Sequence, residues 1–292
     1  MGKEDMAQRK IVLEEGLNIE YEIEKIQEIA ENDSVVLDMQ NIKKISARGI
    51  TTLLIMAYLI YNKIKIPVCL NNISEEIMKY LTQSKFWNVS YISSIDHFDK
   101  IQYYSKQKDG LIFFPIRLVR NDDELLDVNR EFFERQKEWV EISAKVKNGL
   151  LNALNELGDN ALEHSALAQY KKGEFYTFIE ENGDTIVLVV LDMGIGFRNS
   201  LSSVYEDITT DLEALCGVLN KNMTSRIDQG GGAGFYTIKK LVNENNGTLR
   251  MQSGNAIVEY RNGVVEKSYQ IQANIIGSCI LVEQMKVKPL DK

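Results

Sequence analysis

Short apolar runs and stretches with helical spacing alternate along the first third of the chain. They predict a strand at 10–15, a helix at 20–31, a strand at 34–39, a helix at 48–63, a strand at 66–72 and a helix at 74–84. Strands that alternate with helices in this way favour a small α/β domain. The polar stretch "YYSKQKDG" at 103–110 ends this pattern, so we expect one domain at 1–108 and a second at 109–292.

The pattern changes in the second domain, where long helical stretches and β-rich segments are grouped. The predicted elements are a strand at 111–119, helices at 122–140 and 142–166, strands at 173–181 and 185–194, a helix at 235–245 and strands at 247–254, 256–272 and 277–285. The polar segment 197–229 carries no predicted element. Helices on one side of a mixed, largely antiparallel sheet would make an α/β sandwich.

Composition limits the classes of function. The chain has 292 residues, 44% of them hydrophobic and 26% charged, which indicates a globular protein with room for two domains. A formal net charge of −8 argues against non-specific nucleic-acid binding. The cysteines at 69, 216 and 279 are far apart, with no CxxC pair, so neither a zinc site nor a disulfide framework is expected.

No segment is predicted to enter a membrane. The longest apolar run, "ITTLLIMAYLIY" at 50–61, has 12 residues, which is too short to span a bilayer and typical of a buried helix. The first ten residues lack the apolar core of a signal peptide. We therefore expect a soluble, cytoplasmic protein.

The stretch "NALNELGDNALEHS" at 152–165 gathers carboxylates and amides on one face of a predicted helix. The opposite face carries an apolar stripe that should contact the core, formed by Leu150, Leu154, Leu157 and Ala161. The polar face is formed by Glu156, Asp159, Asn160 and Glu163. Such a face is either simply solvated or turned toward a metal ion and a polarised water.

A second motif, "LDMGIGF" at 191–197, follows a hydrophobic strand. The strand ends at Asp192, and Gly194 and Gly196 allow a sharp turn of the backbone. A carboxylate at this place can accept a hydrogen bond from the exocyclic amino group of adenine and would repel the carbonyl oxygen of guanine. An ordinary Asp-Gly turn is the alternative interpretation.

A third motif, "DQGGGAGFYTIKK" at 228–240, places clustered glycines immediately before a helix. Exposed backbone N–H groups and the helix dipole make such a place suitable for phosphates. The Lys-Ser/Thr pair of a Walker loop is missing, and Phe235 occupies the position of the third glycine of a dinucleotide fingerprint. A flexible hinge is an interpretation compatible with phosphate binding.

Together and in this order, the three stretches resemble the motifs of the GHKL (histidine kinase-like, Bergerat fold) ATPase superfamily over residues 109–292. "NELGDNALEH" resembles the N box, "DMGIGF" the G1 box and "GGGAGF" the G2 box. The resemblance implies a site for ATP and Mg²⁺, with ATP and ADP as ligands. A sensor histidine kinase is disfavoured, because "SIDHFDK" around His97 lacks the Glu-Leu-Arg expected after a phosphoacceptor histidine.

The resemblance also implies roles for individual residues. Glu156 would activate the attacking water or substrate, and Asn160 would coordinate magnesium. Asp192 would bind the amino group of adenine at the turn that contains Gly194 and Gly196. The other predicted contacts are the phosphate-binding Gly230, Gly232 and Gly234, Arg226 beside them and Ser278 in the adenine pocket, with Asp159 supporting the metal or water network and His164 in a structural or lid-contacting role. A surface arginine and a serine packed on the sheet are the alternatives for Arg226 and Ser278.

The first domain resembles a STAS domain, the fold of anti-sigma-factor antagonists, over residues 30–90. The resemblance rests on the hydrophobic pattern of "VVLDMQNIKKISARGITTLLIMAYLIYNKIKIPVCLNN" and on Gly49. Ser46 replaces the Asp and Ala47 replaces the phosphorylated Ser that such domains often carry before this helix, so Ser46 is expected to be a helix N-cap. The domain is expected to contact a protein partner or a second copy of the chain.

Three functions fit these observations. The protein could be an ATP-hydrolysing or ATP-gated signalling switch, an anti-sigma-type protein serine/threonine kinase, or a nucleotide-dependent binding module without turnover. Hydrolysis and phosphotransfer need the same Mg-ATP geometry, so the sequence leaves these alternatives open.

Overall fold

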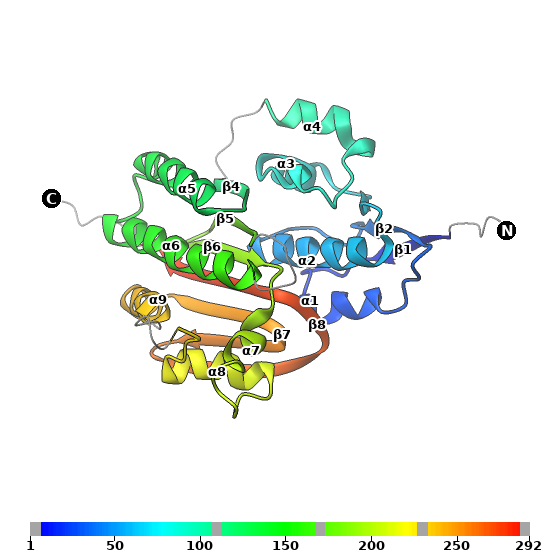
Figure 1. Ribbon diagram of the computed structural model, residues 1–292. Helices are drawn as coiled ribbons and strands as arrows, with labels where there is room; N and C mark the ends of the chain where they lie inside the picture. Colours follow the sequence, from blue (N-terminus) through cyan, green and yellow to red (C-terminus); the bar gives the residue numbers. More distant parts are fainter. Residues whose placement is uncertain (1–6, 107–111, 167–172, 227–232, 287–292) are drawn as a thin grey trace. The chain divides into compact units, whose positions relative to one another are not determined.

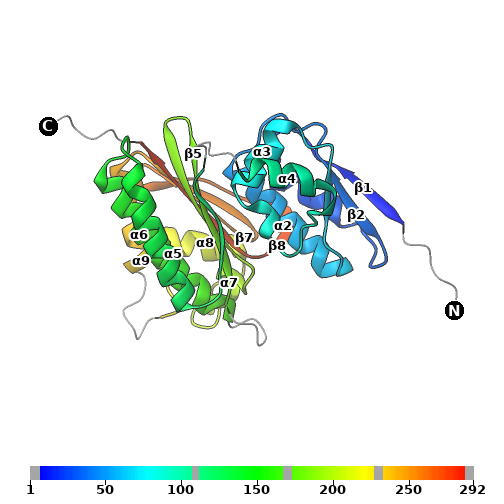
Figure 2. The same cartoon turned by 90° about the horizontal axis from the view of Figure 1, so that it is seen from above.

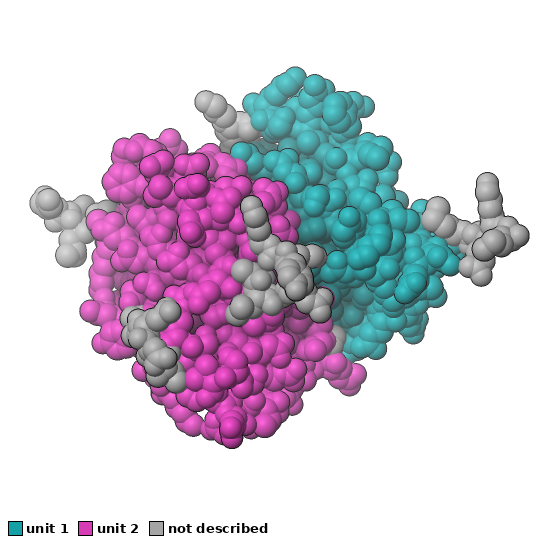
Figure 3. Space-filling view, in the orientation of Figure 1, with its two compact units in different colours: residues 1–112 teal, residues 113–292 magenta. Residues whose placement is uncertain are grey.

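The chain forms two compact units, Met1–Ile112 and Phe113–Lys292, which Figure 3 distinguishes by colour. The computed structural model describes residues 7–106, 112–166, 173–226 and 233–286. The predicted domain boundary between residues 108 and 109 lies outside the described residues. Both units combine helices with a sheet, so the predicted α/β class is confirmed (Figure 1).

The first unit contains a parallel sheet with the strand order β1-β2-β3. Its elements are β1 (Gln8–Val12), α1 (Ile19–Glu22), η1 (Ile23–Ile26), β2 (Ser34–Asp38), α2 (Ala47–Ile64), β3 (Cys69–Asn71), α3 (Glu75–Gln83), η2 (Phe86–Asn88), η3 (Ile95–His97) and α4 (Phe98–Tyr104). The helix predicted at 20–31 is shorter than expected and ends at Ile26, and α4 was not predicted.

Helix α2 contains the longest apolar run of the sequence and is buried on most of its circumference, as predicted. Ile50, Leu53, Leu54, Met56, Ala57 and Ile60 are all fully buried. Among the described residues, no helix combines the length and the apolar character needed to cross a membrane. Ser46 is the N-cap of α2, as predicted, but its side chain makes no capping hydrogen bond.

The second unit places its helices and strands as follows: β4 (Ile112–Val119), α5 (Asp122–Arg135), η4 (Gln136–Glu138), α6 (Ala144–Ala166), β5 (Phe175–Asn182), β6 (Thr185–Asp192), α7 (Gly196–Leu201), α8 (Asp211–Lys221), α9 (Ala233–Glu244), β7 (Thr248–Arg261) and β8 (Val264–Met285). The sheet has the strand order β4-β5-β6-β8-β7. The pairs β5–β6, β6–β8 and β7–β8 are antiparallel.

The helices of this unit pack on one face of its sheet and enclose the core (Figure 2). The predicted apolar stripe of α6 belongs to this core, since Leu150 and Leu154 are 0% exposed, Leu157 is 1% and Ala161 is 4%. The β7–β8 hairpin turns at Asn262 and Gly263, which have φ values of 52° and 87°. Two positive φ angles fit the tight Asn-Gly turn predicted from the sequence.

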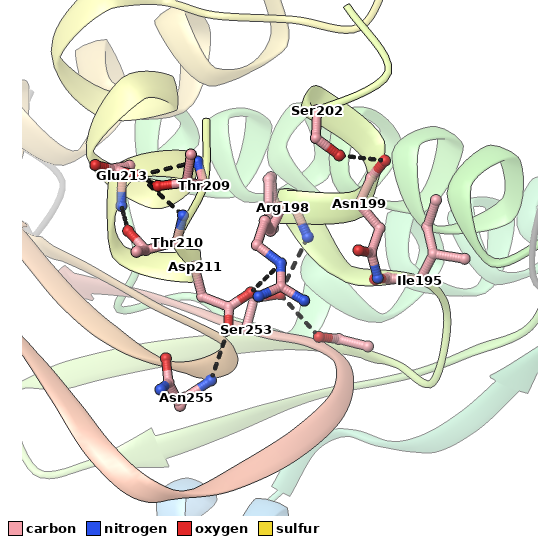
Figure 4. Close-up of polar contacts among 12 residues, drawn as sticks. Ile195, Arg198, Asn199, Ser202, Thr209, Thr210, Asp211, Glu213, Ser253 and Asn255 are labelled. Atoms are coloured by element: carbon pink, nitrogen blue, oxygen red, sulfur yellow. Dashed lines mark hydrogen bonds and ion pairs between the residues drawn. The ribbon is translucent and has the colours of Figure 1, made fainter. Parts of the chain in front are cut away.

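No element was predicted in the polar segment 197–229, but α8 lies within it and α7 extends into it from Gly196 to Leu201. Helix α8 begins with a capping box, in which Thr210 accepts from the Glu213 backbone N–H and Glu213 accepts from the Thr210 backbone N–H. Glu213 also accepts from the Thr209 side chain, and these hydrogen bonds lower the pKa of Glu213 to about 2 (Figure 4).

Asp211, the first residue of α8, connects this helix to the sheet. Its Oδ2 accepts a hydrogen bond of 3.2 Å from the backbone N–H of Asn255 in β7, and its Oδ1 lies 3.7 Å from Nε of Arg198 in α7 (Figure 4). A carboxylate also interacts favourably with the helix N-terminus at which it lies. These contacts hold α7 and α8 against β7, and both helices contribute side chains to the cavity described next.

Candidate functional site

The second unit contains a cavity of about 230 Å³ between α6, α7, α8, α9 and strands β6 and β8. This volume is near the lower end of the ~300–1,000 Å³ typical of small-molecule sites. The lining residues are Glu156, Leu157, Asn160, Ala161, His164, Val190, Asp192, Gly196, Phe197, Ser200, Leu201, Val218, Met223, Thr224, Ser225, Arg226, Gly234, Phe235, Ser278 and Ile280.

Most of the residues predicted from the three motifs meet at this cavity. Glu156, Asn160, His164, Asp192, Gly196, Arg226, Gly234 and Ser278 all line it, although they come from six separate segments of the chain. Gly194 is not among the lining residues but touches Asp192. Asp159, expected to support a metal or water network, is exposed and does not line the cavity. Gly230 and Gly232 lie outside the described residues.

A buried carboxylate lines the cavity. Asp192 is 7% exposed at the end of β6 and pairs in register with Ser278 of β8. The Ser278 hydroxyl donates a short hydrogen bond to Oδ2 of Asp192, and the Gly194 backbone N–H donates to Oδ1 at 2.8 Å. Burial raises the pKa of Asp192 to about 6, although these hydrogen bonds oppose the shift.

Gly277, which sequence reasoning missed, allows the chain to pass close to the backbone of Asp192. It has a φ of +80°, and a Cβ at this position would lie 2.1 Å from the backbone oxygen of Asp192. Ser253 supports the same turn from β7, since its hydroxyl accepts from the Phe197 backbone N–H at 3.1 Å and donates to the Gly277 oxygen at 3.0 Å. Ser253 lies at the centre of Figure 4.

We expect Gly277→Ala to destabilise the second unit by about 3 kcal/mol or more, from left-handed backbone strain and from overlap with Asp192. Thermal unfolding should show a decrease of roughly 6–12 °C in Tm. Gly263→Ala is the matched control, because Gly263 has a φ of +87° and no atom within 4 Å of a Cβ. Equal losses of stability in the two variants would contradict the proposed role of the close contact with Asp192.

Helix α6 and the start of α9 also line the cavity. Glu156 and Asn160 are one helical turn apart on α6, and both are partly exposed to the cavity. A Cβ at Gly234 would lie 2.5 Å from Oε2 of Glu156, so the glycine allows the carboxylate to approach the first turn of α9 closely. Glu156 therefore presents an acceptor, and a possible base, beside the amide of Asn160.

Arg226 and His164 form the wall beyond Glu156 and Asn160. The guanidinium of Arg226 pairs with Glu163 of α6. His164 Nδ1 lies 3.2 Å from the Ser200 hydroxyl, which in turn donates to Ser225 at 3.2 Å. Burial lowers the pKa of His164, which favours a neutral ring at pH 7. This geometry agrees with a structural role for His164 rather than with catalysis.

Several lining residues come from the segment in which no element was predicted. Phe197 of α7 packs edge-to-face against Phe235 of α9, with ring centroids 5.7 Å apart. Ser200, Thr224 and Ser225 add hydroxyl groups to the wall. The spacing Thr210-x-x-Glu213 immediately before the apolar stretch "ALCGVL" was a capping-box signal that could have located α8.

The polar lining suits a ligand that carries both a hydrogen-bond donor and negative charge. Among the described residues there is no group of three or more His, Cys, Asp or Glu side chains that could hold a metal ion. Asn160 could provide one neutral oxygen ligand to a cation that a bound anion also coordinates. Comparison of the sequence with models of known protein families gave no match, and comparison with curated proteins gave none.

Proposed function

We propose that the protein binds Mg-ATP in this cavity and acts as an ATP-hydrolysing or ATP-gated signalling switch. The observation that carries the proposal is the convergence of Glu156, Asn160, Asp192 and Arg226 on one cavity. These residues offer different groups to a ligand. Asp192 is a buried hydrogen-bond acceptor, whereas Glu156, Asn160 and Arg226 provide a carboxylate, an amide and a guanidinium. An adenine nucleotide has the complementary groups, an amino donor and a chain of phosphates.

Binding of the adenine is supported by the surroundings of Asp192. The Asp192 carboxylate accepts hydrogen bonds from the Ser278 hydroxyl and the Gly194 backbone N–H, and an exocyclic amino group would be a further donor to it. The apolar walls provided by Val190, Phe197 and Ile280 suit a flat aromatic base. A guanine base would bring its carbonyl oxygen to the Asp192 carboxylate, which would disfavour GTP.

Binding of the phosphates is supported by the polar side chains of Asn160, Arg226 and Glu156, and it does not require a cluster of acidic metal ligands. Mg²⁺ usually takes one or two protein ligands when phosphates supply others, so the amide of Asn160 is sufficient. Bound magnesium would neutralise phosphate charge. Arg226 offers a planar donor to phosphate oxygens, and Glu156 is placed to accept a proton from a nucleophile.

The resemblance of residues 109–292 to GHKL ATPases agrees with this assignment and motivates the role of the first unit. We propose that the first unit is a STAS-like interaction module that contacts a protein partner or a second copy of the chain. ATP binding or turnover in the second unit would then be the event that the first unit transmits.

A nucleotide titration tests the binding step. ATP and ADP with Mg²⁺ are expected to add about 2.7 kcal/mol to the free energy of unfolding at a ligand concentration 100 times Kd, and so to raise the Tm, whereas GTP should do so far less. Equal stabilisation by ATP and GTP would contradict the role of Asp192. Incubation with γ-labelled ATP, with and without cell extract, then separates the alternatives. Released phosphate supports the switch, a labelled protein supports a kinase, and binding without either supports a module without turnover.

A further inference from the structure

The contact between Arg226 and Glu163 has a consequence for the charged lining of the cavity. Nη2 of Arg226 pairs with Oε2 of Glu163, with the two side chains 30% and 45% exposed. Glu163 lies on α6, on the same polar face as Glu156 and Asn160. Arg226 lines the cavity, whereas Glu163 does not. Glu163 therefore lies outside the cavity and holds the guanidinium of Arg226, which is part of the cavity wall.

The guanidinium of Arg226 has hydrogen-bond donors that the pair with Glu163 does not use. Its Nε is buried and has no hydrogen-bond partner among the described residues. Partial burial and the Asp122 carboxylate raise the pKa of Asp159, and the positive charge of Arg226 opposes this shift. Arg226 thus lies near two acidic residues of α6, Asp159 and Glu163, and pairs with only one of them. A buried donor without an acceptor is unfavourable, and an incoming anion would relieve this cost.

We propose that Glu163 sets the affinity of the site for phosphates. Its carboxylate holds Arg226 against α6 until the phosphates of a nucleotide take the place of that carboxylate. This inference rests on the proposed function. A carboxylate and a phosphate compete for the same guanidinium, because both match its planar fork of N–H donors. Glu163 is therefore a specificity-determining residue that weakens nucleotide binding, in contrast to Asn160 and Asp192, which strengthen it.

The competition depends on the phosphates and not on the base. A nucleotide that draws Arg226 away must break the pair with Glu163 and leave that carboxylate near added negative charge. Both effects oppose the binding of ATP, and neither acts on adenosine, which carries no phosphate. Removing the charge of Glu163 should consequently widen the difference in affinity between ATP and adenosine.

The test compares the affinities of Mg-ATP and adenosine by isothermal titration calorimetry. Glu163→Gln is expected to bind Mg-ATP about three- to fivefold more tightly than the wild type, as suits a partly exposed ion pair, and to bind adenosine equally. In an Arg226→Gln background, Glu163→Gln should strengthen the binding of Mg-ATP less than it does in the wild type, since no ion pair remains to be broken and only the repulsion between the Glu163 carboxylate and the phosphates is removed. Asp127→Asn is the matched control, because it removes one negative charge from an exposed pair with Arg130 outside the cavity.

The outcomes separate this inference from the proposed function. If the wild type binds Mg-ATP and Glu163→Gln binds it equally or more weakly, the role of Glu163 is wrong and the site stands. Equal strengthening of ATP and adenosine, or the same gain in Asp127→Asn, would also overturn it. If the wild type binds neither ligand, the proposed function fails and the inference fails with it. Thermal unfolding of each variant confirms that the measured protein is folded.

Discussion

Glu156→Gln is expected to lower ATP turnover by roughly 100-fold or more, while the Kd of Mg-ATP stays nearly unchanged. Glutamine keeps the shape of the side chain and its hydrogen-bonding capacity but cannot accept a proton from a nucleophile. The close approach of Glu156 to Gly234 is retained, because the two side chains have the same length. Phosphate release under single-turnover conditions, with the Kd measured separately, distinguishes chemistry from binding.

Asn160→Ala provides the complementary result. Removing the amide oxygen takes away the ligand proposed for magnesium, so we expect weaker binding of ATP that depends on Mg²⁺, with little change for ATP in excess EDTA. Loss of ATP binding in Glu156→Gln, together with normal binding and turnover in Asn160→Ala, would show that the two roles are wrongly assigned. A wild-type protein that binds ATP without any turnover would leave binding alone as the function.

Elements with a strong hydrophobic period were predictable from the sequence, and elements that depend on tertiary contacts were not. The apolar stripe of α6 and the run in α2 each mark a helix without reference to the rest of the chain. Helix α8 was not predicted because the segments on either side of it are polar. The capping-box spacing of Thr210 and Glu213 nevertheless marked its start. Helix α1 was predicted too long, since its period continues beyond Glu22 while the chain changes to a 3₁₀ turn.

The candidate site divides in the same way. Glu156, Asn160 and Asp192 stand in local motifs, so their types and spacing could be interpreted before the fold was known. Gly277 was not recognised, because its importance comes from the backbone of Asp192, which reaches it across a strand pair. The pairing of Arg226 with Glu163 likewise joins positions 63 residues apart in the chain, and only the fold brings them together. Sequence patterns therefore identified the polar residues of the site. The close contact at Gly277 and the pair of Arg226 with Glu163 depend on the packing of the folded chain.

Asp192→Asn should have opposite effects on stability and on nucleotide binding. The pKa of Asp192 is raised to about 6 by burial, whereas an unfolded chain releases this proton near pH 3.9. Between these values the folded protein holds a proton that the unfolded chain has lost, so the stability contributed by this group falls as pH rises. Above pH 6 the cost of the buried charge is fully developed, at ~2–3 kcal/mol.

Asparagine at position 192 removes that titration, so the Tm of Asp192→Asn relative to the wild type should increase from pH 4.5 to pH 7.5 in the absence of nucleotide. Affinity for ATP at pH 7.5 should fall at the same time, since a charge-assisted hydrogen bond worth ~1.5–3 kcal/mol is lost, which corresponds to a factor of roughly 10–150 in Kd. Asp38→Asn is the control, as Asp38 is also a buried carboxylate but belongs to the first unit and does not line the cavity, and it should leave the affinity for ATP unchanged. A variant Asp192→Asn that binds ATP as tightly as the wild type, or whose relative Tm falls between pH 4.5 and pH 7.5, would show that this buried carboxylate neither carries the charge nor makes the contact assigned to it.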